Sequence, residues 1–92
     1  MLIKKFFITG CTPCIAVTKV LEELKSEGFK LPEIKETDMS SPKIQWECIE
    51  KYNLVNVPTL IFYEDNGEEK GRLEWFISKE QIVDMLENQP NK

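Results

Sequence analysis

The 92-residue sequence contains no histidine, and no stretch in it approaches the roughly 20 apolar residues that a membrane-spanning helix needs. Basic residues are scattered, and the formal net charge is −4. Nucleic acids and anionic membranes both attract basic surfaces, so we expect neither as a main partner. A zinc site normally takes four cysteine or histidine ligands, and this chain offers only three cysteines. A complete site would therefore need a carboxylate or a second chain.

The first ten residues, MLIKKFFITG, do not have the layout of a signal peptide. Lysines interrupt their apolar run, and no small-residue cleavage site follows. We therefore expect Met1 to begin a cytoplasmic chain. In that reducing compartment a structural disulfide is disfavoured, and an odd number of cysteines does not suit a disulfide framework.

Length and composition predict one domain over residues 1–92, because the sequence contains no internal repeat, low-complexity tract or linker. Hydrophobic periodicity and cap residues predict its elements. They are, in order, a strand at residues 2–8, a helix from Cys11 to Gly28, a strand at 33–38, a helix from Pro42, a strand at 59–63, a strand at 68–75 and a final helix after Ser78. We expect residues 88–92 to be a frayed tail.

Turn and cap signals determine how these elements connect. Asn66-Gly67 predicts a type I′ hairpin turn, in which both residues have positive φ. Ser78 and Gln81 have the spacing of a capping box. The first helix crosses between two strands that we expect to be parallel, whereas the hairpin makes the last two strands antiparallel. The expected fold is α/β, with a mixed four-stranded sheet in the order β-α-β-α-β-β-α and helices on both faces.

Two cysteines, Cys11 and Cys14, stand where the first strand meets the first helix. The unpaired N–H groups and the dipole of a helix N-terminus stabilise a thiolate at Cys11. Cys14 lies one turn further in, and we expect it to be more buried. That asymmetry suits a dithiol exchanger, in which Cys11 is the nucleophile and Cys14 resolves the mixed disulfide. Zinc binding, a structural disulfide and two unrelated buried cysteines are the alternative interpretations.

Three features together resemble the thioredoxin superfamily. They are the unit Cys11-Thr12-Pro13-Cys14 between a strand and a helix, the segment YNLVNVPT at residues 52–59, and the order of the elements. The resemblance implies a thioredoxin-like fold in which the Val57–Pro58 peptide bond is cis and lies beside the cysteines. It also implies a groove in which an extended substrate segment pairs with the backbone. The residues implied to shape that groove are Thr12, Pro13, Val57, Pro58 and Thr59.

Within that family, the sequence favours protein disulfides over glutathione as substrate. Pro13 stands where thioredoxins keep proline, and residues 73–78, LEWFIS, lack the Gly-Gly pair with which glutaredoxins hold glutathione. The small size is nonetheless glutaredoxin-like, so the chain is similar to a compact thioredoxin or a glutaredoxin-like protein. Gly10 replaces the usual tryptophan, and Lys5 replaces a buried aspartate. Because burying an unpaired lysine is costly, we expect Lys5 to reach a strand edge or solvent.

The sequence therefore predicts an enzyme, a thiol-disulfide oxidoreductase that reduces protein disulfides and contributes to electron transport and cell redox homeostasis. We expect no built-in metal or organic cofactor, a flavin-dependent disulfide reductase as electron donor, and a monomer. A glutathione-dependent glutaredoxin is one alternative. A non-catalytic binding module with the same fold is another.

Three further side chains are candidates for a role. Cys48 shares a helical face with Ile44 and Tyr52, which predicts a small core residue rather than a regulatory thiol. Trp46 and Trp75 are candidates for partner docking or for partial burial, and the sequence does not choose between the two.

Overall fold

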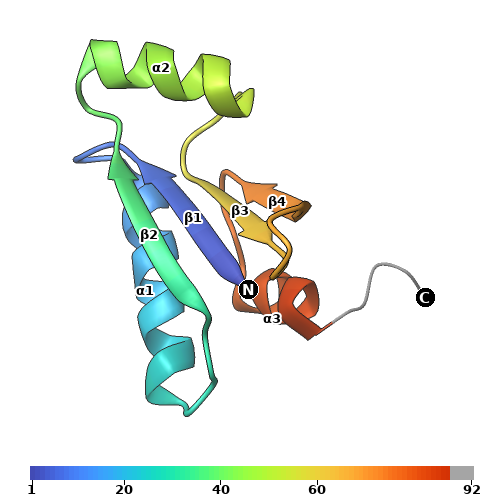
Figure 1. Cartoon of the computed structure of the whole chain (residues 1–92). Coiled ribbons are helices and arrows are strands. Elements are labelled where there is room, and N and C mark those ends of the chain that lie inside the picture. Colours follow the sequence, from blue (N-terminus) through green and yellow to red (C-terminus); the bar gives the residue numbers. More distant parts are fainter. Residues whose placement is uncertain (88–92) are drawn as a thin grey trace.

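The computed structural model describes residues 1–87, and its elements follow the predicted order (Figure 1). The elements are β1 (Leu2–Phe7), α1 (Thr12–Ser26), β2 (Glu33–Asp38), α2 (Pro42–Tyr52), β3 (Thr59–Tyr63), β4 (Glu69–Glu74) and α3 (Lys79–Glu87). The first and last strands are slightly shorter than predicted. The tail expected at residues 88–92 lies outside the described residues.

The four strands form one mixed sheet in the order β2-β1-β3-β4. As predicted, β1 and β2 are parallel, and β3 and β4 are antiparallel. The strand β3 also pairs antiparallel with β1, with Thr59 opposite Phe6. It therefore lies inside the sheet, which is why its apolar residues run without a break. This register brings the start of β3 to the same end of the sheet as the end of β1.

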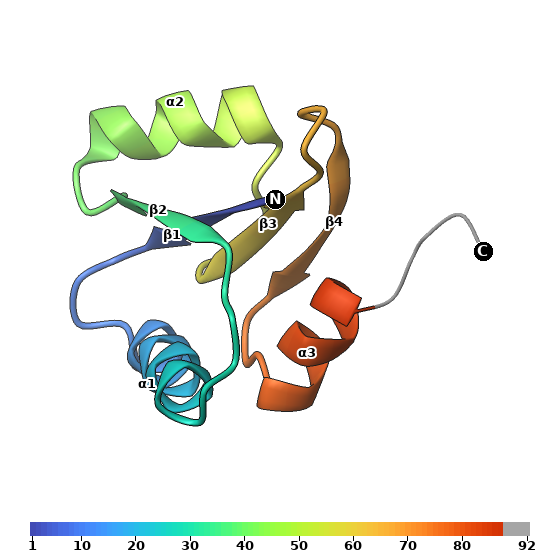
Figure 2. The same cartoon turned by 60° about the horizontal axis from the view of Figure 1, so that its bottom comes forward.

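The helices cover both faces of the sheet, with α2 on one face and α1 and α3 on the other (Figure 2). Two clusters of buried side chains fill the two layers. The cluster facing α1 and α3 comprises Ile3, Val17, Leu21, Leu24, Leu60, Phe62, Ile77 and Ile82. The cluster facing α2 is smaller and comprises Phe6, Met39, Cys48, Leu54 and Ile61. The two-sided core is the reason that both alternating faces of β3 are apolar.

The predicted cap residues define where α1 ends and where α3 begins. Beyond α1, Gly28 has φ 88°, and the N–H of Phe29 donates to the carbonyl of Leu24 at 3.0 Å, which closes the helix end. At α3, the Ser78 and Gln81 side chains each accept from the other residue's backbone N–H, at 3.1 and 2.8 Å. The capping box is thus confirmed. None of the helices within residues 1–87 has the length and apolar character needed to cross a membrane.

The hairpin between β3 and β4 is confirmed, but the predicted type I′ turn is wrong. Gly67 has φ 91°, whereas Asn66 is not in the positive-φ region. The N–H of Gly67 donates to the carbonyl of Glu64 at 2.9 Å, and the N–H of Glu64 donates to the carbonyl of Glu68 at 2.8 Å. The loop is therefore longer than two residues, and only its glycine needs the left-handed conformation. The Asn66 side chain instead accepts from the N–H of Glu68.

Candidate functional site

The site lies at the end of the sheet where β1 leads into α1. Since Phe6 pairs with Thr59 across antiparallel strands, Ile8 and Val57 extend past the ends of their strands side by side. Both residues line the same surface pocket. The Val57–Pro58 peptide bond is cis, as the resemblance implied. The chain thus brings the segment before Cys11 and the segment before Thr59 together.

Cys11 is the N-cap residue of α1, and its backbone is extended, with φ −81° and ψ 121°. Its sulfur accepts a hydrogen bond from the backbone N–H of Cys14 at 3.3 Å. Its carbonyl accepts from the N–H of Ile15 at 3.0 Å, which begins the helix. Pro13 stands within the first turn, where its missing N–H leaves no bond unmade. The predicted placement of a thiol at a helix N-terminus is confirmed.

Cys14 is the more buried of the two cysteines, as predicted. It is 3% exposed, whereas Cys11 is half-buried. Burial raises the pKa of the Cys14 thiol to about 11, and the hydrogen bond with Cys11 acts in the same direction. A backbone hydrogen bond at Ile8 and the charge of Lys5 lower the pKa by smaller amounts. Cys14 therefore stays protonated at neutral pH, while its sulfur remains within one helical turn of Cys11.

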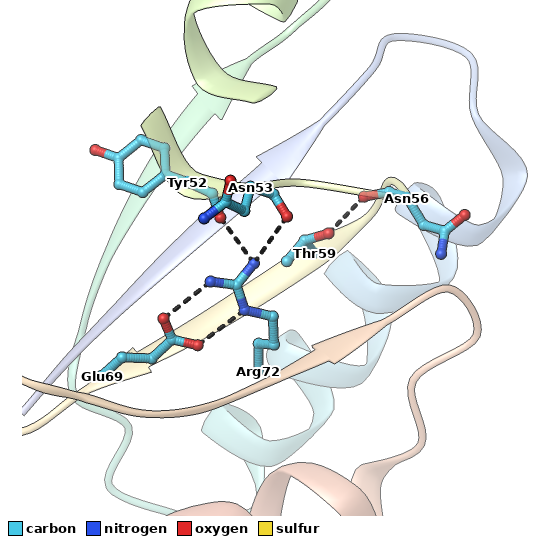
Figure 3. Close-up of polar contacts among 6 residues, drawn as sticks. All are labelled: Tyr52, Asn53, Asn56, Thr59, Glu69 and Arg72. Carbon is cyan, nitrogen blue, oxygen red and sulfur yellow. Dashed lines mark hydrogen bonds and ion pairs between the residues drawn. The ribbon is translucent and has the colours of Figure 1, made fainter. Parts of the chain in front are cut away.

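The five residues predicted to shape a substrate groove differ in how far they reach the surface. Thr12 is exposed, and Pro13 and Val57 are half-buried. Pro58 and Thr59 are buried. The Thr59 hydroxyl donates to the carbonyl of Asn56, which fixes the preceding segment (Figure 3).

Arg72 of β4 holds the end of α2. Its guanidinium donates to the carbonyls of Tyr52 and Asn53 at 2.9 and 3.5 Å, and forms a two-bond ion pair with Glu69 at 2.8 and 2.9 Å (Figure 3). Asn53 has φ 55° and ends the helix. The sequence did not point to Arg72, because its carbonyl partners lie 19 and 20 residues away along the chain.

Two exposed aromatic residues lie at the same end of the sheet. The N–H of Trp75 donates to the carbonyl of Pro58 at 3.0 Å, and Trp75 has φ 73°. Trp75 and Phe76 are 53% and 63% exposed, and their rings meet edge to face at 6.3 Å. Trp46 on α2 is 66% exposed. Both tryptophans were candidates for partner docking from the sequence, but Phe76 was not. Its place next to Trp75, outside the predicted strands, could have indicated that it is exposed as well.

We expected Lys5 to reach a strand edge or solvent. It does reach toward the edge strand β2, but the expectation of solvent exposure is wrong. Its side chain is 4% exposed, and its Nζ donates to the Thr18 hydroxyl at 2.6 Å and lies 3.5 Å from a Glu36 oxygen on the edge strand β2. The burial of Lys5 could have been predicted from the alternation of side chains along β1, since Lys5 shares one face of the strand with Ile3. Burial is tolerated because the ammonium has these two partners.

The third cysteine, Cys48, belongs to the core under α2, as predicted. It is 8% exposed, and burial raises the pKa of its thiol. No cluster of three or more cysteine, aspartate or glutamate side chains that could hold a metal ion occurs within the described part of the chain. The candidate site thus consists of two thiols, one accessible and one buried, beside the surface pocket that Ile8 and Val57 line.

Comparison with known proteins identifies the family. No family model matches the sequence. A thioredoxin of Staphylococcus epidermidis is 30% identical over 82 residues, which span 89% of this chain and 75% of that protein. The chain belongs to the thioredoxin superfamily. A thioredoxin of Staphylococcus aureus is 29% identical over the same share of both chains.

Solved structures agree with the thioredoxin assignment. The reduced thioredoxin pre-protein of Schistosoma mansoni superposes with a TM-score of 0.69 at 30% identity, over 92% of this chain and 74% of that one. Thioredoxin O2 of Arabidopsis thaliana in its oxidised state gives a TM-score of 0.71 at 22% identity, over 94% and 71%. The fold of this chain is therefore thioredoxin-like, and its relatives support a thioredoxin-like redox protein.

Proposed function

We propose that the protein is a dithiol–disulfide oxidoreductase that reduces disulfides of other proteins. One observation carries the proposal. The half-buried sulfur of Cys11 stands at the N-terminus of α1 and accepts the N–H of Cys14, whose own thiol is buried in the same turn. A thiolate at that position is stabilised by the helix end and can be reached by a partner. The buried thiol is protected until an intermediate forms beside it.

The exchange proceeds in two steps that conserve atoms and electrons. The Cys11 thiolate attacks one sulfur of the substrate disulfide; a bond between Cys11 and that sulfur forms, and the second substrate sulfur leaves as a thiolate. Cys14 then loses its proton and attacks Cys11. The Cys11–Cys14 disulfide forms, the bond to the substrate breaks, and the first substrate sulfur leaves with the bonding electron pair. Two electrons pass from the protein to the substrate.

The surface around Cys11 supports an extended protein segment as substrate. Thr12 is exposed beside the nucleophile, and Val57 lines the pocket that extends toward α2. The lining of that pocket is mostly apolar: Ile8, Met39, Gln45, Ile49, Leu54, Val55, Asn56 and Val57. An extended segment can place an apolar side chain there while its backbone runs past Val57. Pro13, Pro58 and Thr59 hold this surface in shape from behind.

We also propose the route by which the protein is reduced again. The oxidised Cys11–Cys14 pair takes two electrons from a flavin-dependent disulfide reductase, and this chain contributes no metal or organic cofactor of its own. The protein acts in the cytoplasm as a monomer.

An insulin-reduction assay with candidate reductases tests the proposal. We expect turnover with a thioredoxin reductase, none for Cys11→Ser or Cys14→Ser, and normal turnover for Cys48→Ser, the matched control. Turnover with glutathione and glutathione reductase alone would instead select the glutaredoxin-like alternative. Full activity of Cys11→Ser in the cellular process would select the non-catalytic binding module.

A further inference from the structure

Lys5 places a buried ammonium group on the face of the sheet that α1 covers. The Lys5 side chain is 4% exposed, and its Nζ donates to the Thr18 hydroxyl at 2.6 Å. The same hydroxyl donates to the backbone carbonyl of Cys14 at 3.2 Å. Lys5, Thr18 and Cys14 thus form a continuous chain of contacts from the central part of β1 to the first turn of α1.

The charge of Lys5 is only weakly compensated. Its carboxylate partner, Glu36, lies at 3.5 Å and has a side chain that is 56% exposed, so water screens it. Glu22 and Lys25 of α1 line the same surface pocket as Lys5 and Glu36, and their opposite charges offset one another. On the side of β1, the Phe7 ring centroid lies 5.4 Å from Nζ. A positive charge enclosed by these groups acts on a nearby buried thiolate more strongly than it would in water.

We propose that Lys5 is a positioning residue for the resolving step, in which its ammonium stabilises the thiolate of Cys14. The inference rests on the proposed disulfide-reductase function. Once the mixed disulfide has formed, Cys14 gives its proton to water and its sulfur becomes negative. In the mixed disulfide, that thiolate attacks the Cys11 sulfur, the Cys11–Cys14 bond forms, and the negative charge leaves on the substrate sulfur. Lys5 favours the first of these states, in which the charge resides on Cys14.

A direct titration of Cys14 tests the inference without any enzyme assay. In a Cys11→Ser/Cys48→Ser background, Cys14 is the one remaining thiol, and its ionisation can be followed by thiolate absorbance. We expect Lys5→Met to move the midpoint upward by about one pH unit, as loss of a nearby opposite charge does. Lys5→Gln retains a hydrogen-bond donor toward Thr18 without the charge, so it should move the midpoint equally. Lys5→Arg should largely restore it.

Lys4 is the matched control, because it is the neighbouring lysine but contacts the opposite face, where its Nζ donates to the Tyr52 hydroxyl at 2.9 Å. Lys4→Gln should leave the Cys14 midpoint unchanged. In the chain with all three cysteines, Lys5→Gln should slow resolution of a preformed mixed disulfide about threefold at neutral pH. This follows because a tenfold loss of thiolate is partly offset by the greater nucleophilicity of a more basic thiol.

Two results would overturn the inference: an unchanged Cys14 midpoint in folded Lys5→Gln, or an equal shift in Lys4→Gln. Circular dichroism establishes that each variant is folded, and if Lys5→Met does not fold, Lys5→Gln alone decides. The proposed function fails separately, if the unmodified protein reduces no insulin, and in that case the titration still reports whether Lys5 acts on Cys14.

Discussion

Cys11 and Cys14 occupy one helical turn but have different surroundings. Cys11 caps the helix and is half-buried, whereas Cys14 faces the core and is 3% exposed. Burial makes the charged form of Cys14 unfavourable and raises its pKa to about 11. This difference indicates which cysteine carries out which proposed step. The accessible sulfur of Cys11 attacks the substrate, and the buried sulfur of Cys14 reacts once the mixed disulfide lies beside it.

The raised pKa of Cys14 predicts a pH-dependent resolving step. Below about pH 11 the thiolate fraction of Cys14 grows tenfold per pH unit, so release of substrate from the mixed disulfide should accelerate by about that factor. Stopped-flow measurement with a chromophoric thiol attached to Cys11 follows the release. A rate that levels off near pH 8 would contradict the assigned environment of Cys14.

The same shift predicts that the reduced protein loses stability in alkali. A buried thiol with a raised pKa stabilises the fold below the pKa of the unfolded chain, and that contribution disappears as the pH rises from about 9 to about 11. Denaturant unfolding at several pH values measures it. Cys14→Ala, which has no thiol to ionise there, should show a shallower decline, and equal slopes in the two proteins would contradict the prediction.

At the scale of the elements, two sets of interactions position the site: the helix caps and the contacts of Arg72. The start of α1 positions Cys11, and Arg72 holds the end of α2 and the segment that leads to Val57. Glu74 supports that segment as well, because its carboxylate accepts from the Asn56 side chain at 3.2 Å. The segment between α2 and β3 is therefore held in part by side chains of β4.

The capping box of α3 allows a matched comparison with α2. Ser78 makes its cap hydrogen bond, whereas Ser41, the N-cap of α2, makes none through its side chain. We expect Ser78→Ala to lower the free energy of unfolding by about 1 kcal/mol and Ser41→Ala by only a few tenths. Chemical denaturation of both variants measures the difference. Equal losses would show that the Ser78 hydrogen bond contributes nothing specific.

Removal of the Arg72 side chain should loosen the segment before β3. Arg72→Met loses the bonds to Tyr52 and Asn53, and we expect a cost of about 1–2 kcal/mol in unfolding free energy. Amide hydrogen exchange should become faster at residues 53–57. Glu69→Gln is the control: it removes a partly exposed ion pair but leaves the carbonyl bonds, so its cost should stay below about 1 kcal/mol. Equal effects of both variants would contradict the assigned role.

At the scale of the whole molecule, the helix ends and the strand order could be predicted from the sequence, whereas the type of the β3–β4 turn and the depth of individual side chains could not. Gly28 and Ser78 mark helix ends through bonds within a few residues, and both were predicted. The depth of Lys5 depends on Thr18 of a different element. Trp75 has a positive φ and donates to the carbonyl of Pro58 in a distant segment, and its local sequence encodes neither feature.

The two-layer core predicts where substitution damages the whole fold. Leu60 is 0% exposed in the inner strand β3, so we expect Leu60→Ala to cost about 2–5 kcal/mol, a large part of the about 5–15 kcal/mol typical of a domain. Val55, at 79% exposure, should tolerate alanine within about 0.5 kcal/mol. Urea unfolding distinguishes the two. A small effect at Leu60 would contradict the assigned packing of the sheet.

The central claim is that Cys11 attacks a protein disulfide and Cys14 completes the exchange. Mass spectrometry of Cys14→Ser, incubated with insulin and quenched with acid, tests it most directly, because this variant can form the mixed disulfide but cannot resolve it. We predict one insulin molecule attached through Cys11, its two chains still joined by the remaining interchain disulfide, and none attached when Cys11 is also replaced by serine. Attachment at Cys48, or no adduct at all, would contradict the account.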